Sequence, residues 1–116
     1  KTGVFNGTIK IDNALSLKST YNPVTLWLES QWLGTFYSMG SKWIYHPSLE
    51  WLYVVHDGST DGYWFWDPFY EKWWWTSPSI FPYFAVQSHE LMWHYFDLSD
   101  PVRAFDFDQK IWRNRP

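Results

Sequence analysis

The chain contains no cysteine, so disulfide bonds and thiolate metal sites are excluded. Charged residues make up only 18% of its 116 residues, below the roughly 25% of an average globular domain. The net charge of −3 argues against a nucleic-acid-binding module, which would carry a basic patch. No apolar run approaches the roughly 20 residues that a membrane-spanning helix needs. Helices are not expected either, because no stretch of about a dozen residues keeps its apolar positions at helical spacing.

Aromatic residues are in excess: they form 24% of the chain, and 11 of them are tryptophan. Two copies of one pattern begin at Trp43 and Trp64. Each copy reads ring, apolar residue, ring, then His or Asp, then Pro, a short polar turn and a second aromatic strand, and the second turn is one residue longer. A repeat of about 20 residues indicates tandem β-hairpins. The predicted hairpins pair 43–46 with 51–55 and 63–67 with 73–76, with Pro47 and Pro68 entering equivalent turns.

The rest of the chain extends this pattern. A degenerate third copy covers 81–96 with a turn at 87–90, and the tail from Ala104 to Trp112 is interpreted as a closing strand and cap. Residues 1–22 lack tryptophan and are interpreted as a leading hairpin whose first strand, Thr8–Asp12, packs within the monomer or pairs with a neighbour. We therefore predict one all-β domain over 1–116, built as a meander, a small barrel or a short solenoid. Its parts are the leading hairpin or arm (1–22), the tryptophan-rich hairpin repeats (23–112) and a short tail (113–116).

Alternation along the predicted strands places rings on both faces of the sheet. Either two layers pack together or one face meets a partner. A 116-residue domain has too little interior for every ring, so part of the cluster on the second hairpin is expected to be exposed. Trp51 and Trp93, on the returning strands, are predicted to be mostly buried. The cluster comprises Trp64, Trp66, Trp73, Trp74 and Trp75.

The order of these motifs resembles a tryptophan-rich β-repeat module found near the C-termini of secreted and surface proteins of environmental bacteria. The likeness covers roughly 25–112, and it implies an extracellular or cell-surface β module without implying any catalytic residue. The chain departs from the family pattern at the turns, where Glu50 and Lys72 stand in place of a glycine before the returning tryptophan. A weaker likeness, to the aromatic hairpin repeats of choline- and glucan-binding proteins, is an analogy only. The motifs that carry the first resemblance are 32–37, 42–47, 50–53, 64–68, 73–76, 81–84 and 93–95.

Two functions compete on this pattern. The rings could bind carbohydrate, because pyranose rings stack on indole while neighbouring polar side chains bond the sugar hydroxyls. Alternatively, they could join copies of the chain into a surface layer or filament, because Tyr and Trp are enriched at interface cores. A third reading is that they only form the core and pack the repeats. The candidate ligand-binding residues are Trp64, Trp66, Trp73, Trp75, Asp67, Glu71, Trp43 and His46.

Catalysis and metal binding are not expected. No Ser, Cys or Lys lies in a nucleophile motif, no glycine-rich phosphate loop is present, and the four histidines lack metal-ligand spacing. The stretch Asp57, Ser59, Asp61 and Gly62 is similar to the start of a calcium loop, but the twelfth position is Pro68 instead of Glu. A solvated turn is the simpler interpretation. We therefore predict a noncatalytic module without cofactor, whose partner is a glycan or a second copy of itself.

Overall fold

The computed structural model describes residues 19–38, 41–59 and 61–115, and in these ranges the chain is all β, as predicted. The described residues contain no helix long and apolar enough to cross a membrane. The predicted strand Thr8–Asp12 and most of the predicted leading hairpin lie outside the described residues. The strands are β1 (Thr20–Tyr21), β2 (Leu28–Ser30), β3 (Gly34–Ser38), β4 (Trp43–His46), β5 (Glu50–His56), β6 (Tyr63–Asp67), β7 (Lys72–Thr76), β8 (Tyr83–Gln87), β9 (Leu91–Asp97), β10 (Arg103–Asp106) and β11 (Ile111–Asn114).

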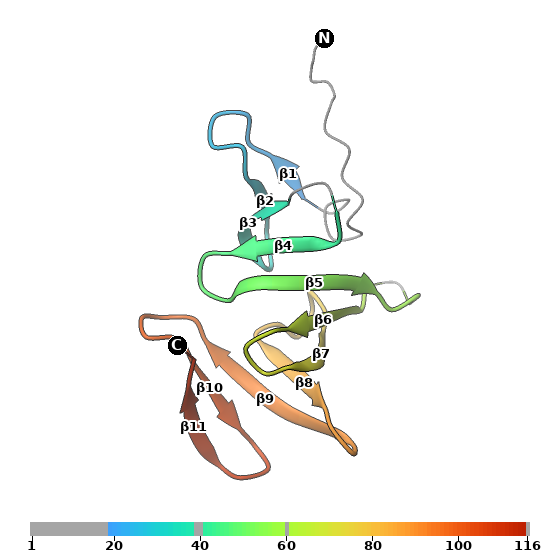
Figure 1. Ribbon diagram of the computed structural model, residues 1–116, viewed down its shortest axis with the longest axis vertical. Helices are drawn as coiled ribbons and strands as arrows, with labels where there is room; N and C mark the ends of the chain where they lie inside the picture. The colour runs from blue at the N-terminus through green and yellow to red at the C-terminus, as the bar shows by residue number, and fades with distance from the viewer. Residues whose placement is uncertain (1–18, 39–40, 60, 116) are drawn as a thin grey trace.

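Each strand pairs antiparallel with the next one in the chain, so the sheet is a meander in the order β1 to β11 (Figure 1). The sheet twists strongly along its length: β4 and β5 run across the view of Figure 1, whereas β10 and β11 run steeply. Of the three arrangements left open by the sequence, the structure adopts the meander, and the sheet does not close into a barrel.

The two repeated hairpins form as predicted. β4 pairs with β5 around a turn at 47–49, and β6 pairs with β7 around a turn at 68–71, which is one residue longer. Pro47 and Pro68 are the first residues of these turns, where a missing N–H does not interrupt the ladder. The degenerate third copy is the β8–β9 hairpin.

In four of the hairpins a residue with a left-handed backbone lies at the start of the returning strand, either as its first residue or directly before it. Glu50 has φ of 67°, Glu71 has 55° and Lys110 has 59°, while Gly34 has 92° in the earlier β2–β3 turn. This conformation explains why glycine suits the position, since a side chain there is strained. In the second hairpin the strained residue is Glu71, not Lys72 as the sequence comparison with the family suggested.

The tail differs from the single closing strand that the sequence predicted. It is a complete hairpin, β10 with β11, around a turn at 107–110. Asp106 precedes this turn as Asp67 precedes the turn of the second repeat, and in both the backbone N–H of the left-handed residue bonds the aspartate carbonyl, at 2.6 Å from Lys110 and 2.7 Å from Glu71. The tail is therefore a further copy of the same hairpin, in which Phe107 occupies the proline position.

One face of the coiled sheet forms the core. Phe84 and Phe96 stack with ring centroids 3.8 Å apart, and Phe65 stacks on Trp74 at 4.5 Å. Because the sheet coils, this single face packs against itself and no second layer is needed. The fully buried members of the core include Phe36, Ile44, Leu49, Leu52, Val54, Tyr63, Phe65, Trp74, Phe84 and Phe96.

Candidate functional site

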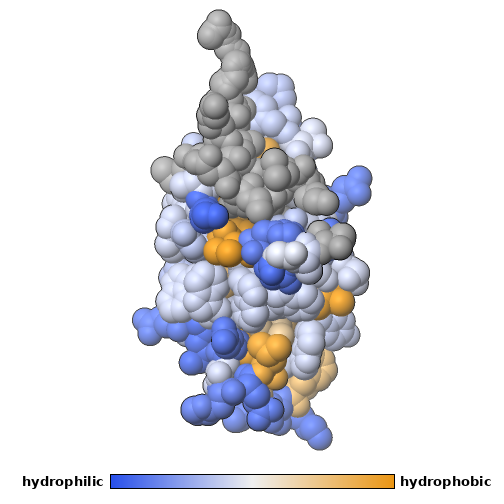
Figure 2. Space-filling model, turned by 90° about the vertical axis from the view of Figure 1, so that its right-hand side faces the viewer, coloured by the Kyte–Doolittle hydropathy of each residue, from blue (hydrophilic) through white to orange (hydrophobic). Residues whose placement is uncertain are grey.

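The opposite face of the sheet is covered with aromatic rings, and we call it the aromatic face. Strand alternation turns these residues away from the core. Every strand from β3 to β11 contributes at least one ring. The side of the molecule in Figure 2 shows many pale residues of intermediate hydropathy across its middle, with hydrophilic and hydrophobic residues among them. The aromatic face comprises Tyr37, Trp43, Tyr45, Trp51, Tyr53, Trp64, Trp66, Trp73, Trp75, Tyr83, Trp93, Tyr95, Phe105 and Trp112.

Rings of the aromatic face pack edge to face across neighbouring strands. Trp66 and Trp73, on β6 and β7, have centroids 5.7 Å apart at 63°, and Trp43 and Tyr53, on β4 and β5, have centroids 5.3 Å apart at 66°. Cross-strand ring pairs of this kind stabilise a sheet by about 0.5–1.5 kcal/mol each. The rings therefore serve the stability of the meander first, and only their outer surfaces are left for a ligand.

Exposure follows the face on which each ring lies. Trp43, Trp64, Trp66, Trp73 and Trp75 are half-buried on the aromatic face, whereas Trp74 is buried in the core.

The prediction that Trp51 and Trp93 are mostly buried is wrong: they are 42% and 45% exposed. Their strands turn Leu52, Val54 and Phe96 inward instead, so the two tryptophans face outward.

A hollow of about 240 Å³ lies within the aromatic face and is lined by Val55, Trp64, Trp73 and Gln87. These four residues come from the consecutive strands β5, β6, β7 and β8. We call it the Trp64–Trp73 hollow. Two indole rings and an exposed amide line it, and none of the lining residues is charged.

The loop between β5 and β6 fixes the ring next to this hollow. The Asp57 carboxylate accepts a bond of 2.8 Å from Trp75 Nε1, and its other oxygen accepts the Ser59 amide and hydroxyl. The hydrogen bond from the Ser59 hydroxyl is the main reason that the pKa of Asp57 is lowered. Asp57 thus positions Trp75.

Among the described residues, no group of three or more His, Asp or Glu side chains is arranged to hold a metal ion.

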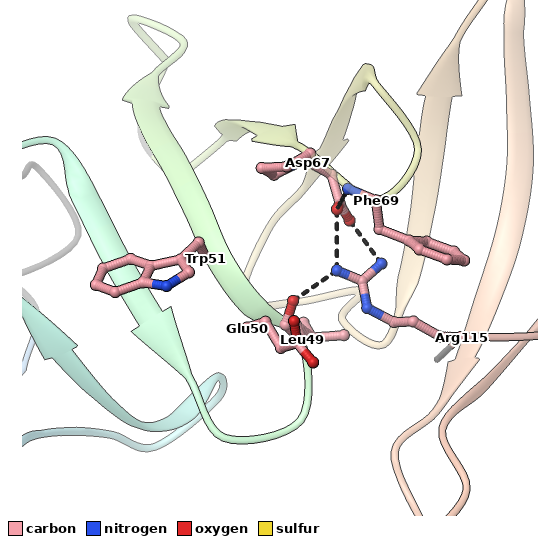
Figure 3. A pocket seen from close by; sticks show the side chains of 7 residues that line it. Leu49, Glu50, Trp51, Asp67, Phe69 and Arg115 are labelled. Atoms are coloured by element: carbon pink, nitrogen blue, oxygen red, sulfur yellow. Dashed lines mark hydrogen bonds and ion pairs between the residues drawn. The ribbon is translucent and has the colours of Figure 1, made fainter.

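Asp67 lies on the core side of the sheet, away from the rings of the hollow. Arg115 bonds both carboxylate oxygens of Asp67, at 2.7 and 2.9 Å, and also donates to the Leu49 carbonyl at 2.6 Å (Figure 3). The side chains of Asp67 and Arg115 are 0% and 3% exposed. Trp74 Nε1 and the Phe69 amide complete the carboxylate's bonds at 2.9 Å each.

Aromatic rings also flank the Arg115 guanidinium. It lies 5.0 Å from the centre of the Phe69 ring and 5.5 Å from that of Tyr70. Burial raises the pKa of Tyr70 to about 12, so its hydroxyl stays protonated. Through these contacts Arg115, directly after β11, is bound to Asp67 and Leu49, which lie 48 and 66 residues earlier in the sequence.

His46 occupies in the first repeat the position that Asp67 occupies in the second, and its side chain likewise accepts backbone amides of the turn that follows. Its Nδ1 accepts the amides of Ser48 and Leu49, at 3.0 and 3.2 Å, and its Nε2 lies 2.8 Å from the Leu33 carbonyl. Since Nδ1 accepts, Nε2 carries the proton, and the ring is neutral. Burial lowers the pKa of His46 accordingly. Ser30 and Asp106 cap their own turns in the same way.

The predicted ligand-binding set is therefore brought together only in part. Trp64 and Trp73 meet in one hollow with Trp66 and Trp75 beside it, while His46 and Asp67 are engaged in turns on the core side and Glu71 lies in an exposed turn. The polar group that the hollow does contain is Gln87. Sequence reasoning missed it because position 87 was assigned to a turn, although it ends β8.

The fold and this surface define a single-sheet meander of aromatic hairpins. Comparison with protein-family models, with curated proteins and with solved structures found no match to the chain.

Proposed function

We propose that the chain is a noncatalytic carbohydrate-binding module and that it binds through the Trp64–Trp73 hollow. The observation that carries this proposal is the lining itself: two half-buried indoles and an exposed amide in one shallow depression. Indole offers a flat surface to the C–H face of a pyranose, and the Gln87 amide offers both a donor and an acceptor to its hydroxyls.

The absence of charge points to an uncharged glycan. The outward strand positions from β4 to β8 carry no Asp, Glu, Lys or Arg. An anionic polysaccharide would call for Arg or Lys at the contact. Recognition of this kind suits a module that meets polysaccharide outside the cell, and we propose that location for it.

Binding to a panel of polysaccharides tests the proposal. Trp73→Ala and Gln87→Ala should each weaken retention on an uncharged polysaccharide at least about tenfold, because one loses a stacking ring and the other its hydrogen bonds. Trp112→Ala is the matched control, since that ring is 45% exposed on β11, outside the hollow. A single cooperative unfolding transition in each variant would show that folding is intact, and Trp73→Ala should melt at a lower temperature because it loses its contacts with Tyr53 and Trp66. Equal retention of wild type and Trp73→Ala would refute the site.

Self-association is the second candidate function, and the edge of the sheet favours it. Among the described strands β11 is last in the order, its four residues are all exposed, and Ile111 and Trp112 are 41% and 45% exposed. An exposed edge with apolar side chains can pair with a second copy of the chain. Sedimentation velocity distinguishes the two functions: a concentration-dependent polymer that Trp112→Lys dissociates supports assembly, whereas a monomer at all concentrations rejects it.

A further inference from the structure

A second hollow lies near the other end of β8. It has a volume of about 480 Å³ and is lined by Ser79, Ile80, Phe81, Pro82, Tyr83 and Trp93. Tyr83 and Trp93 are 43% and 45% exposed, among the most exposed rings of the aromatic face. Behind Tyr83, the ring of Phe107 lies parallel at 6.0 Å and supports it. We call this the Tyr83–Trp93 hollow.

Strand β8 connects the two hollows. Gln87 lines the first and Tyr83 the second, and both residues share the outward side of β8 because they are four positions apart. At about 3.3 Å per residue, their backbones are separated by about 13 Å. Between them Ala85 is opposite Trp75 on one side and Trp93 on the other. Aromatic rings therefore flank β8 on both sides between the two hollows.

The linings of both hollows are uncharged. None of the ten residues that line the hollows is Asp, Glu, Lys, Arg or His. Each hollow combines aromatic rings, half-buried in the first and including the exposed Tyr83 and Trp93 in the second, with one exposed polar side chain, Gln87 or Ser79. The separation exceeds the width of one pyranose ring, so a single sugar cannot contact both.

We propose that the Tyr83–Trp93 hollow is a second subsite for the same ligand, which is an extended, uncharged hexose polysaccharide lying along β8. This inference rests on the proposed function. Sugar residues at the ends of one chain segment occupy the two hollows, and residues between them cross the Trp75 and Trp93 rings. Because the second contact is intramolecular once the first has formed, affinity rises steeply when the chain becomes long enough to reach it.

Calorimetry with oligosaccharides of defined length tests this proposal. The probes are soluble β-1,4- and β-1,3-linked glucose oligomers of one to six residues, with a polygalacturonate oligomer as the anionic comparison. For the wild-type chain we expect affinity to rise at least about tenfold between two and six residues. Trp93→Ala should remove that rise and leave the affinity for the shortest binding oligomer unchanged. Trp73→Ala should weaken every length.

The controls separate the two proposals. Trp112→Ala carries the same substitution at a ring of equal exposure and should match wild type at every length. Affinity that is flat with length, or a Trp93→Ala variant equal to wild type on the hexamer, would overturn the second subsite while leaving the first intact. Failure of every uncharged oligomer to bind would overturn both, as would binding confined to the anionic probe. Thermal melting of Trp93→Ala within a few degrees of wild type shows that the loss is not one of folding.

Discussion

Replacing Arg115 by methionine should lower the unfolding temperature of this protein markedly, although the residue lies outside the strands, directly after β11. Its guanidinium makes three hydrogen bonds, two to the Asp67 carboxylate and one to the Leu49 carbonyl, and its side chain is 3% exposed. Methionine preserves most of the apolar volume but removes the charge and every donor.

The size of the expected loss in stability follows from the Asp67 carboxylate, which stays buried without its partner. Asp67 is 0% exposed, and without Arg115 only the Phe69 amide and Trp74 Nε1 would bond its carboxylate. Removing one partner of a buried ion pair costs about 3–5 kcal/mol, because the other charge stays uncompensated. For a domain of this length, about 4 °C is lost per kcal/mol, so the melting temperature should fall by roughly 12–20 °C.

The assay is thermal and urea unfolding of Arg115→Met beside Arg113→Met. Arg113 is the matched control: it precedes Arg115 by two residues, its side chain is 50% exposed, and its nearest carboxylate oxygen, of Asp106, is 3.8 Å away. Because the Arg113 side chain is half exposed and the contact is long, this pair contributes no more than about 1 kcal/mol. The double variant Arg115→Met with Asp67→Asn should recover part of the loss, because the unpaired charge is then absent. If Arg115→Met melts within about 4 °C of wild type, the reasoning about this buried pair is wrong.

Three further perturbations test the turns and loops. The pKa of His46 is lowered in the folded state, so stability should be full above the unfolded pKa of about 6.5 and fall as the pH drops below it; the difference in melting temperature between wild type and His46→Asn, followed from pH 7.5 to 5, should shrink or reverse, and a constant difference would contradict a neutral, buried His46. A Cβ at Gly62 would collide with the Asp57 carboxylate and lie 2.7 Å from Trp75 Nε1. Gly62→Ala should therefore lower the free energy of unfolding by about 1–3 kcal/mol and shift the NMR resonance of the Trp75 indole N–H. An unmoved resonance would show that Gly62 does not affect the hydrogen bond from Trp75 to Asp57. Lys110→Gly relieves a φ of 59° and should stabilise the chain by about 0.5–1 kcal/mol in urea unfolding, whereas a loss of stability would show that the turn is not strained.

Most of the fold could be predicted because its units are local. Alternating rings and the turns at Pro47 and Pro68 involve residues within one hairpin, and the hairpins formed where the pattern placed them. The tail hairpin was missed because Phe107 replaces the proline that marks the other turns, although Asp106 keeps its capping position. The candidate site was predictable in its tryptophans only. Gln87 carried no signal, since an isolated glutamine at a strand end looks like a turn residue.

The sequence by itself determined an all-β chain of aromatic hairpins, because a period of two along each strand and turn residues between strands are properties of neighbouring positions. Only the tertiary structure decided which of the two apolar faces became the core. Coiling of the sheet buries Trp74 and leaves Trp51 and Trp93 outside, and no local pattern distinguishes these three rings. The coil also brings Arg115 to Asp67 across 48 residues, so a carboxylate that the sequence offered as a ligand for sugar is instead the buried partner of the last described residue. That outcome depends on the summed twist of the eleven strands in the described part of the chain, which is a property of the whole sheet and of no single hairpin.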